Sequence, residues 1–366
     1  PVLVVADFTG NQGKAERHVA PLARVADPTL LCVNPPSAID GVAVDTPPTV
    51  GVRPLDLLSL ALFAVVESVR SDYAAVCSFS LFPYGCAALI AGRAAALPTH
   101  LGVIGGDLDV HATGRYGPAV RWLMSRFAVV SVPGEASRRK LDALGVRPGT
   151  VATLTNPIRP AAFPETSPAS NRPIDLLWVG RFSAEKDPGQ FVDVVAETVA
   201  AAEERNLRAV MVGDGPRRAA VESRIRSRGI GAHVELPGWV EDPGAYYRNA
   251  RVYVLTSDRE GLPLTLVEAM ASGATPVAPD VGNVTEVAVD GRTAEIVPDG
   301  ETAGLADAAT RLLADDDRRI GLATNAIDVR ETCSYEAAAE DWRGILAALG
   351  VPTETAESER ARPLSA

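Results

Sequence analysis

The chain has 366 residues, of which 47% are apolar and 22% are charged, and its formal net charge is -11 at pH 7. This length predicts two domains, and the composition is that of a globular protein. The acidic balance disfavours nonspecific binding to nucleic acid.

The N-terminal half alternates short apolar runs with longer helical segments. The apolar runs predict strands at residues 2–6, 29–33, 74–79, 99–105 and 128–132. The segments between them predict helices at residues 14–25, 54–70 and 84–96. Continuous apolar strands separated by helices are typical of a parallel sheet covered on both faces. The first half is therefore predicted to be a doubly wound α/β domain, over about residues 1–165.

Residues 157–173 hold five prolines without helical or strand periodicity, and we interpret them as a linker. The alternation then restarts and predicts a second doubly wound domain over residues 172–334. Its strands are expected at 175–180, 208–213, 233–238, 252–257 and 275–279. Ligands of such domains bind at the carboxyl ends of strands, so we expect the site in a cleft between the two domains. The polar tail, residues 351–366, is predicted to be disordered.

The four cysteines, at positions 32, 77, 86 and 333, show no C-x-x-C or Cys/His ligand spacing. Free thiols in a reducing cytosol fit this pattern better than a disulfide framework or a zinc site. No run reaches the roughly 18 apolar residues that a membrane span requires, and the start has no basic signal-peptide region. We therefore expect a cytoplasmic protein.

Two strand-to-helix turns follow in the second half. VGRFSAEKDPGQF (179–191) places Arg181 and Lys186 in the loop before a helix, next to Gly180. Cations beside the free N–H groups of a helix start predict an anion site, although two solvated surface charges would give the same pattern. VGDGPRRA (212–219) has Arg218 where a dinucleotide fingerprint needs its third glycine, which favours a plain tight turn.

EGLPLTLVEA (260–269) sets two glutamates around a turn and a helix start. Pro263 suits the first helical position, so the N–H groups of Leu264 and Thr265 are expected to face outward and to hold a phosphate. Glu260 precedes them, and Glu268 lies one turn beyond Leu264 on the same helix face. One carboxylate on each side of a diphosphate matches the hydroxyls of a sugar nucleotide.

These residues resemble a known family. E-G-L-P-L-T-L-V-E is similar to the E-x7-E motif of retaining GT-B glycosyltransferases of family 4, and VGRFSAEKD, VGDGP and VELPGWV follow the same order. The resemblance implies a GT-B fold, with two Rossmann-like domains facing a central cleft. It implies that the donor is bound by Gly180, Gly261, Leu264 and Thr265. It places Arg181 and Lys186 on the diphosphate, and Glu268 on the ribose. It also places Glu260 by the transferred sugar, and Trp239 and Val240 near the base. It also implies that a last helix, about 335–349, crosses back to the first domain.

The first half resembles the family in fewer places. TGNQGKAERHV (9–19) is similar to the loop that lines the acceptor side, with Gly10 and Gly13 as its glycines, and IGGDLDV (104–110) implies an acceptor-side Asp107. Ile104 stands where the family has His or Arg. His18 and His100 are candidate acceptor-site groups or plain packed histidines.

Two patterns of the first half allow another interpretation. Asp107, Asp109 and His111 alternate as metal ligands do in the other large glycosyltransferase fold, which has no E-x7-E. RYGPAVRWLMSRF (115–127) interleaves Arg with aromatic residues, as in a helix that covers the sheet or in an acceptor or membrane-surface face.

The expected function is that of a retaining, metal-independent glycosyltransferase. It would move a sugar from a UDP- or GDP-linked donor to a hydroxyl of a glycan, lipid or small molecule, without a cofactor. The partners are the nucleotide sugar and the acceptor, with peripheral membrane contact as a further option and no nucleic acid. The alternatives are a sugar-nucleotide epimerase or phosphorylase on the same fold, or a non-catalytic sugar-nucleotide-binding subunit.

Overall fold

The computed structural model describes residues 1–104, 106–159, 162–163, 167–201, 206–298 and 300–352. The chain divides into two compact units: Pro1–Pro157 with Ser334–Ala366, and Ile158–Cys333. Residues 353–366, which hold most of the predicted tail, lie outside the described residues, as do 160–161 and 164–166 of the predicted linker. Each unit contains a parallel sheet, so the prediction of two doubly wound α/β domains is confirmed.

The first unit is built on a sheet with the strand order β3-β2-β1-β4-β5-β6-β7, and every pairing is parallel. Its strands are β1 (Val2–Val5), β2 (Pro28–Leu31), β3 (Ala43–Asp45), β4 (Val76–Phe79), β5 (Thr99–Gly102), β6 (Val129–Val132) and β7 (Thr150–Thr153). Its helices are α1 (Gln12–Ala23), α2 (Arg53–Arg70), α3 (Cys86–Ala95), α4 (Gly117–Met124), α5 (Glu135–Ala143) and α14 (Tyr335–Ala348), with the π-helical turns η1 (Leu81–Gly85) and η2 (Asp107–His111).

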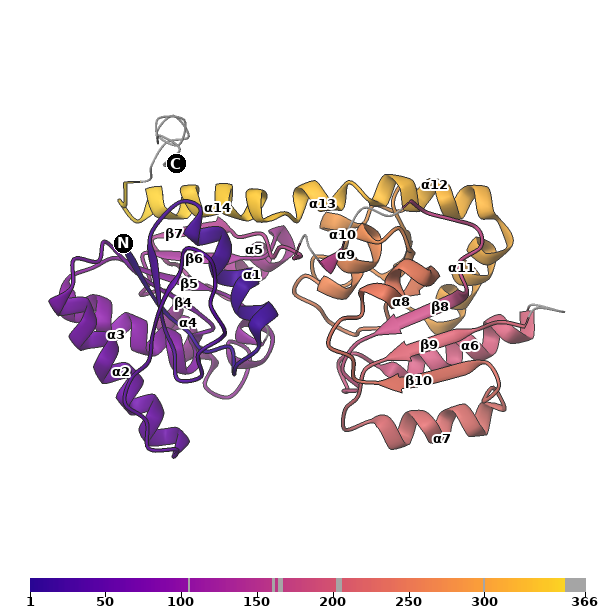
Figure 1. Cartoon of the computed structure of the whole chain (residues 1–366), viewed down its shortest axis with the longest axis horizontal. Coiled ribbons are helices and arrows are strands. Elements are labelled where there is room, and N and C mark those ends of the chain that lie inside the picture. The colour runs from indigo at the N-terminus through magenta and orange to yellow at the C-terminus, as the bar shows by residue number, and fades with distance from the viewer. Residues whose placement is uncertain (105, 160–161, 164–166, 202–205, 299, 353–366) are drawn as a thin grey trace, which may run out of the picture. The chain divides into compact units, whose positions relative to one another are not determined.

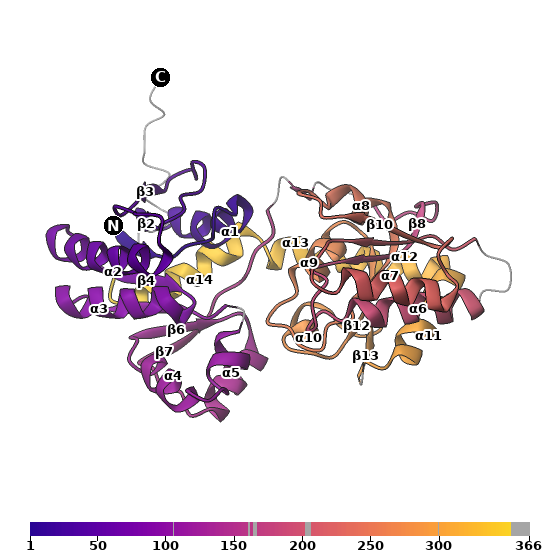
Figure 2. The ribbon, with the colours of Figure 1, turned by 90° about the horizontal axis from the view of Figure 1, so that it is seen from below.

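Two helical layers cover this sheet because alternate strand residues point to opposite faces. Leu3 and Val5 of β1 pack with α2 and α3, whereas Val2 and Val4 pack with α1 and α14. The helix pairs α2–α3 and α1–α14 each lie side by side in both views of the unit (Figures 1 and 2). The central strands β1, β4 and β6 are therefore buried on both faces, which explains their largely apolar sequence.

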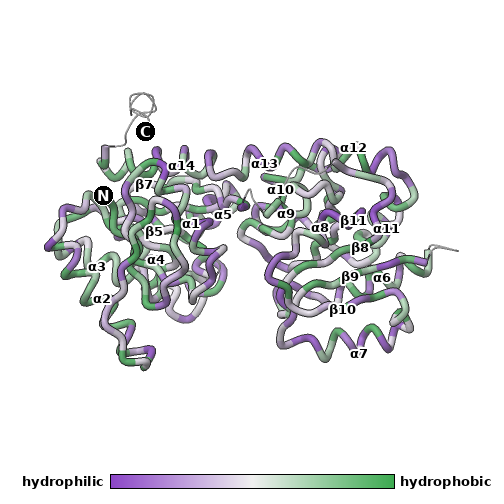
Figure 3. Tube along the Cα trace, in the orientation of Figure 1, coloured by the Kyte–Doolittle hydropathy of each residue, from purple (hydrophilic) through white to green (hydrophobic). Residues whose placement is uncertain are grey.

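The second unit has the strand order β10-β9-β8-β11-β12-β13, again all parallel. Its strands are β8 (Ile174–Val179), β9 (Ala209–Val212), β10 (Val234–Gly238), β11 (Ala250–Val254), β12 (Thr275–Pro279) and β13 (Glu295–Val297). Its helices are α6 (Pro188–Ala201), α7 (Arg218–Arg228), α8 (Gly244–Asn249), α9 (Leu264–Ala271), α10 (Val284–Val287), α11 (Thr302–Ala314), α12 (Asp316–Ala326) and α13 (Val329–Thr332). Hydrophobic residues run along the central strands β8 and β9 (Figure 3).

The first and last segments of the second unit are joined to its core and to each other. Ile158 and Phe163, within the segment predicted as a linker, are buried in its core with Tyr247. At the other end, Cys333 O accepts a hydrogen bond from Ile158 N at 3.0 Å. The chain then enters α14, whose Trp342 is fully buried in the first unit.

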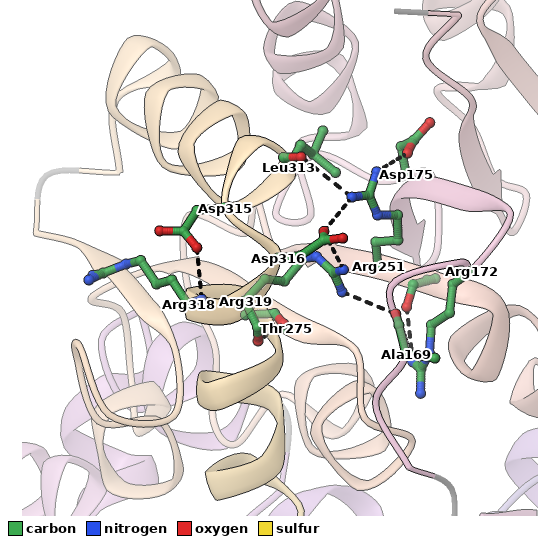
Figure 4. A network of polar contacts seen from close by, with 11 residues as sticks. Ala169, Arg172, Asp175, Arg251, Thr275, Leu313, Asp315, Asp316, Arg318 and Arg319 are labelled. Carbon is green, nitrogen blue, oxygen red and sulfur yellow. Dashed lines mark hydrogen bonds and ion pairs between the residues drawn. The ribbon is translucent and has the colours of Figure 1, made fainter.

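Buried arginines tie the helices of the second unit to its strands. Arg251 lies between Asp175 and Asp316, and Asp316 also accepts a hydrogen bond from Arg319 (Figure 4). Arg172 donates to the carbonyls of Ser272, Ala250 and Tyr247, which joins the end of α9 to α8 and the start of β11. Burial and the nearby charge of Arg319 lower the pKa of Arg172 to about 10. This network holds α8 and α9 in a fixed relation to each other.

Candidate functional site

The candidate donor-site residues follow the carboxyl ends of the second unit's strands. Gly180, Arg181 and Lys186 lie after β8, Trp239 and Val240 after β10, and Glu260 after β11. Because all these strands are parallel, their carboxyl ends share one edge of the sheet. The fold therefore brings these loops to the edge at which such sheets bind ligands.

Lys186 and Glu260 form an ion pair across two of these loops. Lys186 Nζ lies 2.5 Å from Glu260 Oε1, and the side chains are 28% and 8% exposed. The sequence predicted that these residues serve different parts of one ligand, and the structure adds that they contact each other. The ammonium and the carboxylate thus compensate each other's charge.

The loop that carries Lys186 is fastened to the end of β11. Thr256 Oγ1 lies 3.0 Å from the carbonyl oxygens of both Lys186 and Asp187, and it accepts a hydrogen bond from Trp178 Nε1 at 2.9 Å. Asp258 N donates to Glu185 O at 3.0 Å. These bonds fix the backbone of the loop from which the side chain of Lys186 extends.

Two glycines allow the loops to approach this closely. A Cβ on Gly213, whose φ is +137°, would lie 1.8 Å from Gly180 O. A Cβ on Gly282, whose φ is +59°, would lie 1.9 Å from Glu260 O. Only glycine fits at such distances and at such φ values. Asn283 holds the second approach through hydrogen bonds from its N and Nδ2 to Gly261 O, at 3.0 and 2.9 Å.

Helix α9 begins at Leu264, one residue later than predicted, because Pro263 is its N-cap with extended ψ. Leu264 and Thr265 are therefore the first two helical residues, and their N–H groups have no acceptor within the helix. Tyr253 on β11 donates from its hydroxyl to Thr265 Oγ1 at 2.7 Å, which fixes this first turn. The helix start lies four residues beyond Glu260, so the positive end of its dipole adds to the charge of Lys186.

Glu268 lies on α9 and accepts a hydrogen bond from the hydroxyl of Tyr247, at 3.0 Å. Tyr247 is fully buried on α8, between Phe163 and Tyr253. Burial first and the Glu268 carboxylate second raise the pKa of Tyr247 well above its ordinary value. The tyrosine therefore remains a hydrogen-bond donor and orients the carboxylate of Glu268.

Arg181, Trp239 and Val240 follow strands that end at the same sheet edge. Arg181 is exposed and forms no ion pair or side-chain hydrogen bond with the part of the chain that the structure describes. The side chain of Trp239 is 71% exposed, and Val240 is half-buried against the core. Arg181 thus offers a positive charge that pairs with none of the described residues.

On the first unit, the predicted acceptor-side residues lie in different settings. Gly10, at φ +72°, has open space where a Cβ would point, and Gly13 lies in the first turn of α1. Asp107 is 1% exposed and accepts hydrogen bonds from Ser80 Oγ and from the backbone N–H groups of Leu81 and Ile104. Burial raises the pKa of Asp107, and these bonds oppose that shift. Its carboxylate joins the loops that follow β4 and β5.

The histidines and the alternating Asp-x-Asp segment do not form a metal cluster. His18 stacks on Phe8 and Phe79, and His100 bonds to Ser131 Oγ at 2.8 Å; burial lowers the pKa of each histidine to about 3. Asp109 pairs with Lys140. Among the described residues, no group of three or more His, Cys, Asp or Glu side chains is arranged to hold a metal ion.

Sequence reasoning did not find the residues that orient the site. No role was predicted for Tyr247, Tyr253 or Thr256, and each forms its contacts at the site through one hydroxyl. The tyrosine pair in GAYYRN indicates only a buried helix face. A contact between α8 and α9 cannot be derived from local sequence.

A comparison with protein families matches residues 173–315 to the model described as glycosyl transferases group 1. The chain is also similar to two curated proteins. It is 33% identical over 196 residues to the alpha-D-kanosaminyltransferase of Streptomyces kanamyceticus, a match that covers 53% of this chain and 50% of that protein. It is 34% identical over 251 residues to the D-inositol 3-phosphate glycosyltransferase of Nocardia farcinica, over 63% of this chain and 54% of that protein. The chain thus spans about half the length of the curated relatives it matches.

Solved structures are similar over nearly the whole chain. HepE of Anabaena, determined with UDP and glucose, has a TM-score of 0.78 at 17% identity, covering 94% of this chain and 99% of that one. Sucrose-phosphate synthase of Thermosynechococcus elongatus has a TM-score of 0.71 at 17% identity, covering 95% and 99%. At this identity the likeness establishes the fold, which is the GT-B fold that the sequence predicted.

Proposed function

We propose that this chain, whose residues 173–315 are a glycosyl transferases group 1 domain, is a glycosyltransferase that uses a UDP- or GDP-linked sugar. The curated relatives named above are glycosyltransferases, and HepE was determined with UDP and glucose. The acceptor is a hydroxyl on a glycan, lipid or small molecule. The second unit binds the donor, and the first unit serves the acceptor.

The observation that carries this proposal is that three positively charged or polarised groups follow the carboxyl ends of neighbouring strands, near Glu260. The ammonium of Lys186, the unpaired guanidinium of Arg181 and the start of α9 all follow the carboxyl ends of β8 and β11. A departing diphosphate gains negative charge in the transition state, and fixed positive groups stabilise that charge. In the same proposal Glu268 binds the ribose, Trp239 and Val240 lie near the base, and Glu260 contacts the transferred sugar.

We assign a retaining, metal-independent reaction to this site. The bond between the anomeric carbon and the phosphate oxygen breaks, and the diphosphate leaves with the electron pair. The acceptor oxygen then bonds to the same face of the carbon, and its proton passes to the leaving diphosphate. Lys186, Arg181 and α9 provide the charge that a divalent ion would otherwise supply.

The role of the first unit is proposed from Gly10, Gly13 and Asp107. Asp107 orders the loops after β4 and β5, and Gly10 leaves space beside the start of α1. The described cysteines are free, which fits a reducing compartment, so we propose a cytoplasmic location. No helix among the described residues is both long and apolar enough to cross a bilayer.

The test is a transfer assay with isotopically labelled donor sugars, with and without EDTA. We expect transfer to an added acceptor, with the anomeric configuration of the donor retained and with no loss in EDTA. Arg181→Ala should lower kcat/KM by roughly two to three orders of magnitude, as for other lost transition-state donors. Arg226→Ala, an exposed arginine on α7, is the matched control and should leave activity unchanged.

Three outcomes would reject parts of this proposal. Epimerised donor, or sugar phosphate formed from a glycan, would indicate the alternative enzyme classes. Donor binding without turnover for every acceptor class would indicate a binding subunit. Activity that EDTA abolishes and magnesium or manganese restores would reject metal independence.

A further inference from the structure

The exposed large hydrophobic side chains gather on one part of the first unit. Fourteen such residues occur in the part of the chain that the structure describes, and twelve of them fall between residues 50 and 122. The two others, Trp239 and Val289, lie on the second unit. The twelve are Val50, Val52, Leu55, Leu58, Leu62, Val66, Val69, Phe82, Ile90, Val110, Tyr116 and Trp122.

Seven of the twelve lie on α2, α3 and α4, which form one layer over a face of the sheet. Leu60 of α2 packs with Leu3 and Val5 of β1, and Val120 of α4 packs with Leu101 of β5 and Val130 of β6, on the same face of the sheet. Helices α1 and α14 occupy the opposite face. We call the outer surface of this layer, made by α2, α3, α4 and the turns beside them, the α2–α4 face.

Helix α2 shows the clearest separation of its two sides. Its buried residues repeat every four positions and face α3: Asp56, Leu60, Ala64 and Ser68. Its exposed apolar residues form a second stripe at spacings of three and four: Leu55, Leu58, Leu62, Val66 and Val69. A helix that already buries one stripe needs no second apolar stripe for its own fold.

The charges on the α2–α4 face have the opposite sign to the whole chain. Between residues 50 and 126, the exposed cations are Arg53, Arg70, Arg93, Arg115 and Arg126. Asp72 is the one exposed acid of that segment within the described residues; Glu67 and Asp109 are half-buried, Asp109 pairs with Lys140, and Asp56 and Asp107 are buried. The chain as a whole has a net charge of -11. This face is therefore a locally basic surface on an acidic protein.

The arginines and the apolar side chains are interleaved. The guanidinium of Arg126 lies 4.4 Å from the ring centre of Trp122, and that of Arg115 lies 5.9 Å from the ring of Tyr116. On α2 and α3, Arg70 follows Val66 by four residues and Arg93 follows Ile90 by three, which places each pair on one side of its helix. Arginine beside Trp and aliphatic residues is typical of surfaces that lie in the headgroup region of a bilayer.

We propose that the α2–α4 face binds the surface of an anionic lipid bilayer, with its apolar side chains among the headgroups and its arginines on lipid phosphates. The charge complementarity favours this partner over a second copy of the chain, because a symmetric contact would bring the arginines of two copies together. The inference does not depend on glycosyl transfer. A transferase bound to the membrane surface would encounter a lipid-linked acceptor by diffusion in the plane of the bilayer.

The experiment is co-sedimentation of the full chain with vesicles of phosphatidylcholine, with and without phosphatidylglycerol. We expect binding only to the vesicles that contain phosphatidylglycerol, weakened by salt above about 0.15 M. Arg70→Gln and Arg93→Gln should each weaken binding about fivefold. Leu58→Ser with Leu62→Ser should weaken it by about tenfold or more. Val289→Ser, an exposed apolar residue of the second unit, is the matched control and should bind as the unchanged protein does.

Sedimentation equilibrium without lipid tests the alternative, in which the α2–α4 face binds a second copy of the chain. A dimer that the Leu58/Leu62 double variant dissociates, with no binding to anionic vesicles, would assign the face to a second copy and overturn the proposal. Equal binding of both vesicle types, or full binding by the arginine variants, would also reject it. Because the arginine side chains are exposed, their variants remain informative if the leucine variant folds poorly, which circular dichroism would reveal.

Discussion

At the scale of single residues, the ion pair between Lys186 and Glu260 joins two groups to which we assign different roles in the proposed donor site. A diphosphate requires the ammonium, and a sugar hydroxyl requires the carboxylate, yet the two groups lie 2.5 Å apart. A bare nucleoside diphosphate must compete with Glu260 for Lys186. An intact donor gives Glu260 a hydroxyl in exchange. Under the roles proposed above, the pair would favour the intact donor over the product diphosphate.

This arrangement predicts that a substitution of Glu260 raises the affinity for a nucleoside diphosphate although it lowers the rate of transfer. Glu260→Gln removes the competing charge, so the nucleoside diphosphate should bind about fivefold more tightly, of the order expected for a partly exposed ion pair. Transfer should nevertheless fall, because the carboxylate no longer serves the sugar. Calorimetry with UDP and GDP, beside steady-state kinetics, measures both effects. Weaker binding of the diphosphate by Glu260→Gln would show that Lys186 does not serve the phosphates.

A second residue-scale prediction concerns Tyr247, which acts through Glu268. Tyr247→Phe keeps the buried ring and removes one hydrogen bond, which is worth about 0.5–1.5 kcal/mol. If Glu268 binds the ribose, donor and free nucleotide should lose the same several-fold affinity while kcat is nearly kept. Tyr253→Phe is the control, since its hydroxyl bonds to Thr265 and not to Glu268. An equal change of KM in both variants would mean that Tyr247 only stabilises the fold.

At the scale of elements, close approaches between loops set the positions of Glu260 and of the loop that carries Lys186. The loop that contains Gly282 passes against the backbone of Glu260, and the loop that contains Gly213 passes against Gly180. Hydrogen bonds from Asn283 to Gly261 and from Thr256 to the Lys186 loop then hold these crossings. The geometry of Glu260 thus depends on a glycine that is distant in sequence.

Gly282→Ala should therefore impair the site without touching the ligand. The new Cβ would lie 1.9 Å from Glu260 O, so the loop must move and the Lys186–Glu260 pair must separate. We expect a loss of transfer of at least about tenfold, of the kind that small misplacements cause. Gly229→Ala is the control, because its φ is also positive, at +71°, but its Cβ would meet open space. It should cost only about 1 kcal/mol of backbone strain and leave transfer intact. Equal kinetics of the two variants would contradict this role of Gly282.

The same scale shows what the sequence could predict. Buried strands such as β1, β4 and β6 consist almost entirely of apolar residues, and the sequence predicts them within a few residues. The edge strands β3 and β7 were missed, because they are short and their residues are exposed or half-buried, so their composition resembles that of loops. The motif glutamates were predicted, but Tyr247 and Asn283 were not, because their importance arises from contacts between distant elements.

At the scale of the whole molecule, the repeated strand–helix alternation predicted two doubly wound domains, and the resemblance carried by the E-x7-E motif implied the GT-B fold. The boundary was harder to place. Proline-rich sequence suggested a linker over residues 157–173, whereas Ile158 and Phe163 are buried in the second unit. Two apolar residues among prolines carry no periodic signal, so their burial follows from tertiary structure alone.

The two buried histidines of the first unit make its stability depend on pH. Burial lowers the pKa of His18 and of His100 to about 3, below the ordinary value of 6.5. Between these values the unfolded chain binds protons that the folded unit excludes, so the stabilising contribution is complete above pH 6.5 and decreases as the pH falls toward 3. At pH 5 each histidine should lower the free energy of unfolding by about 2 kcal/mol relative to neutral pH.

Urea unfolding of the full chain at pH 7.5 and pH 5 tests this dependence, with the fluorescence of the buried Trp342 beside His100 as the probe of the first unit. His100→Gln should lower the free energy of unfolding at pH 7.5, because the ring packs against Phe79 and Trp342. It should also reduce the further loss at pH 5 by about half, since one of two buried histidines no longer titrates. His111→Gln, at an exposed position, should leave both values unchanged. If His100→Gln keeps the full loss between pH 7.5 and pH 5, the acid sensitivity does not come from this histidine, and its buried neutral state would need another explanation.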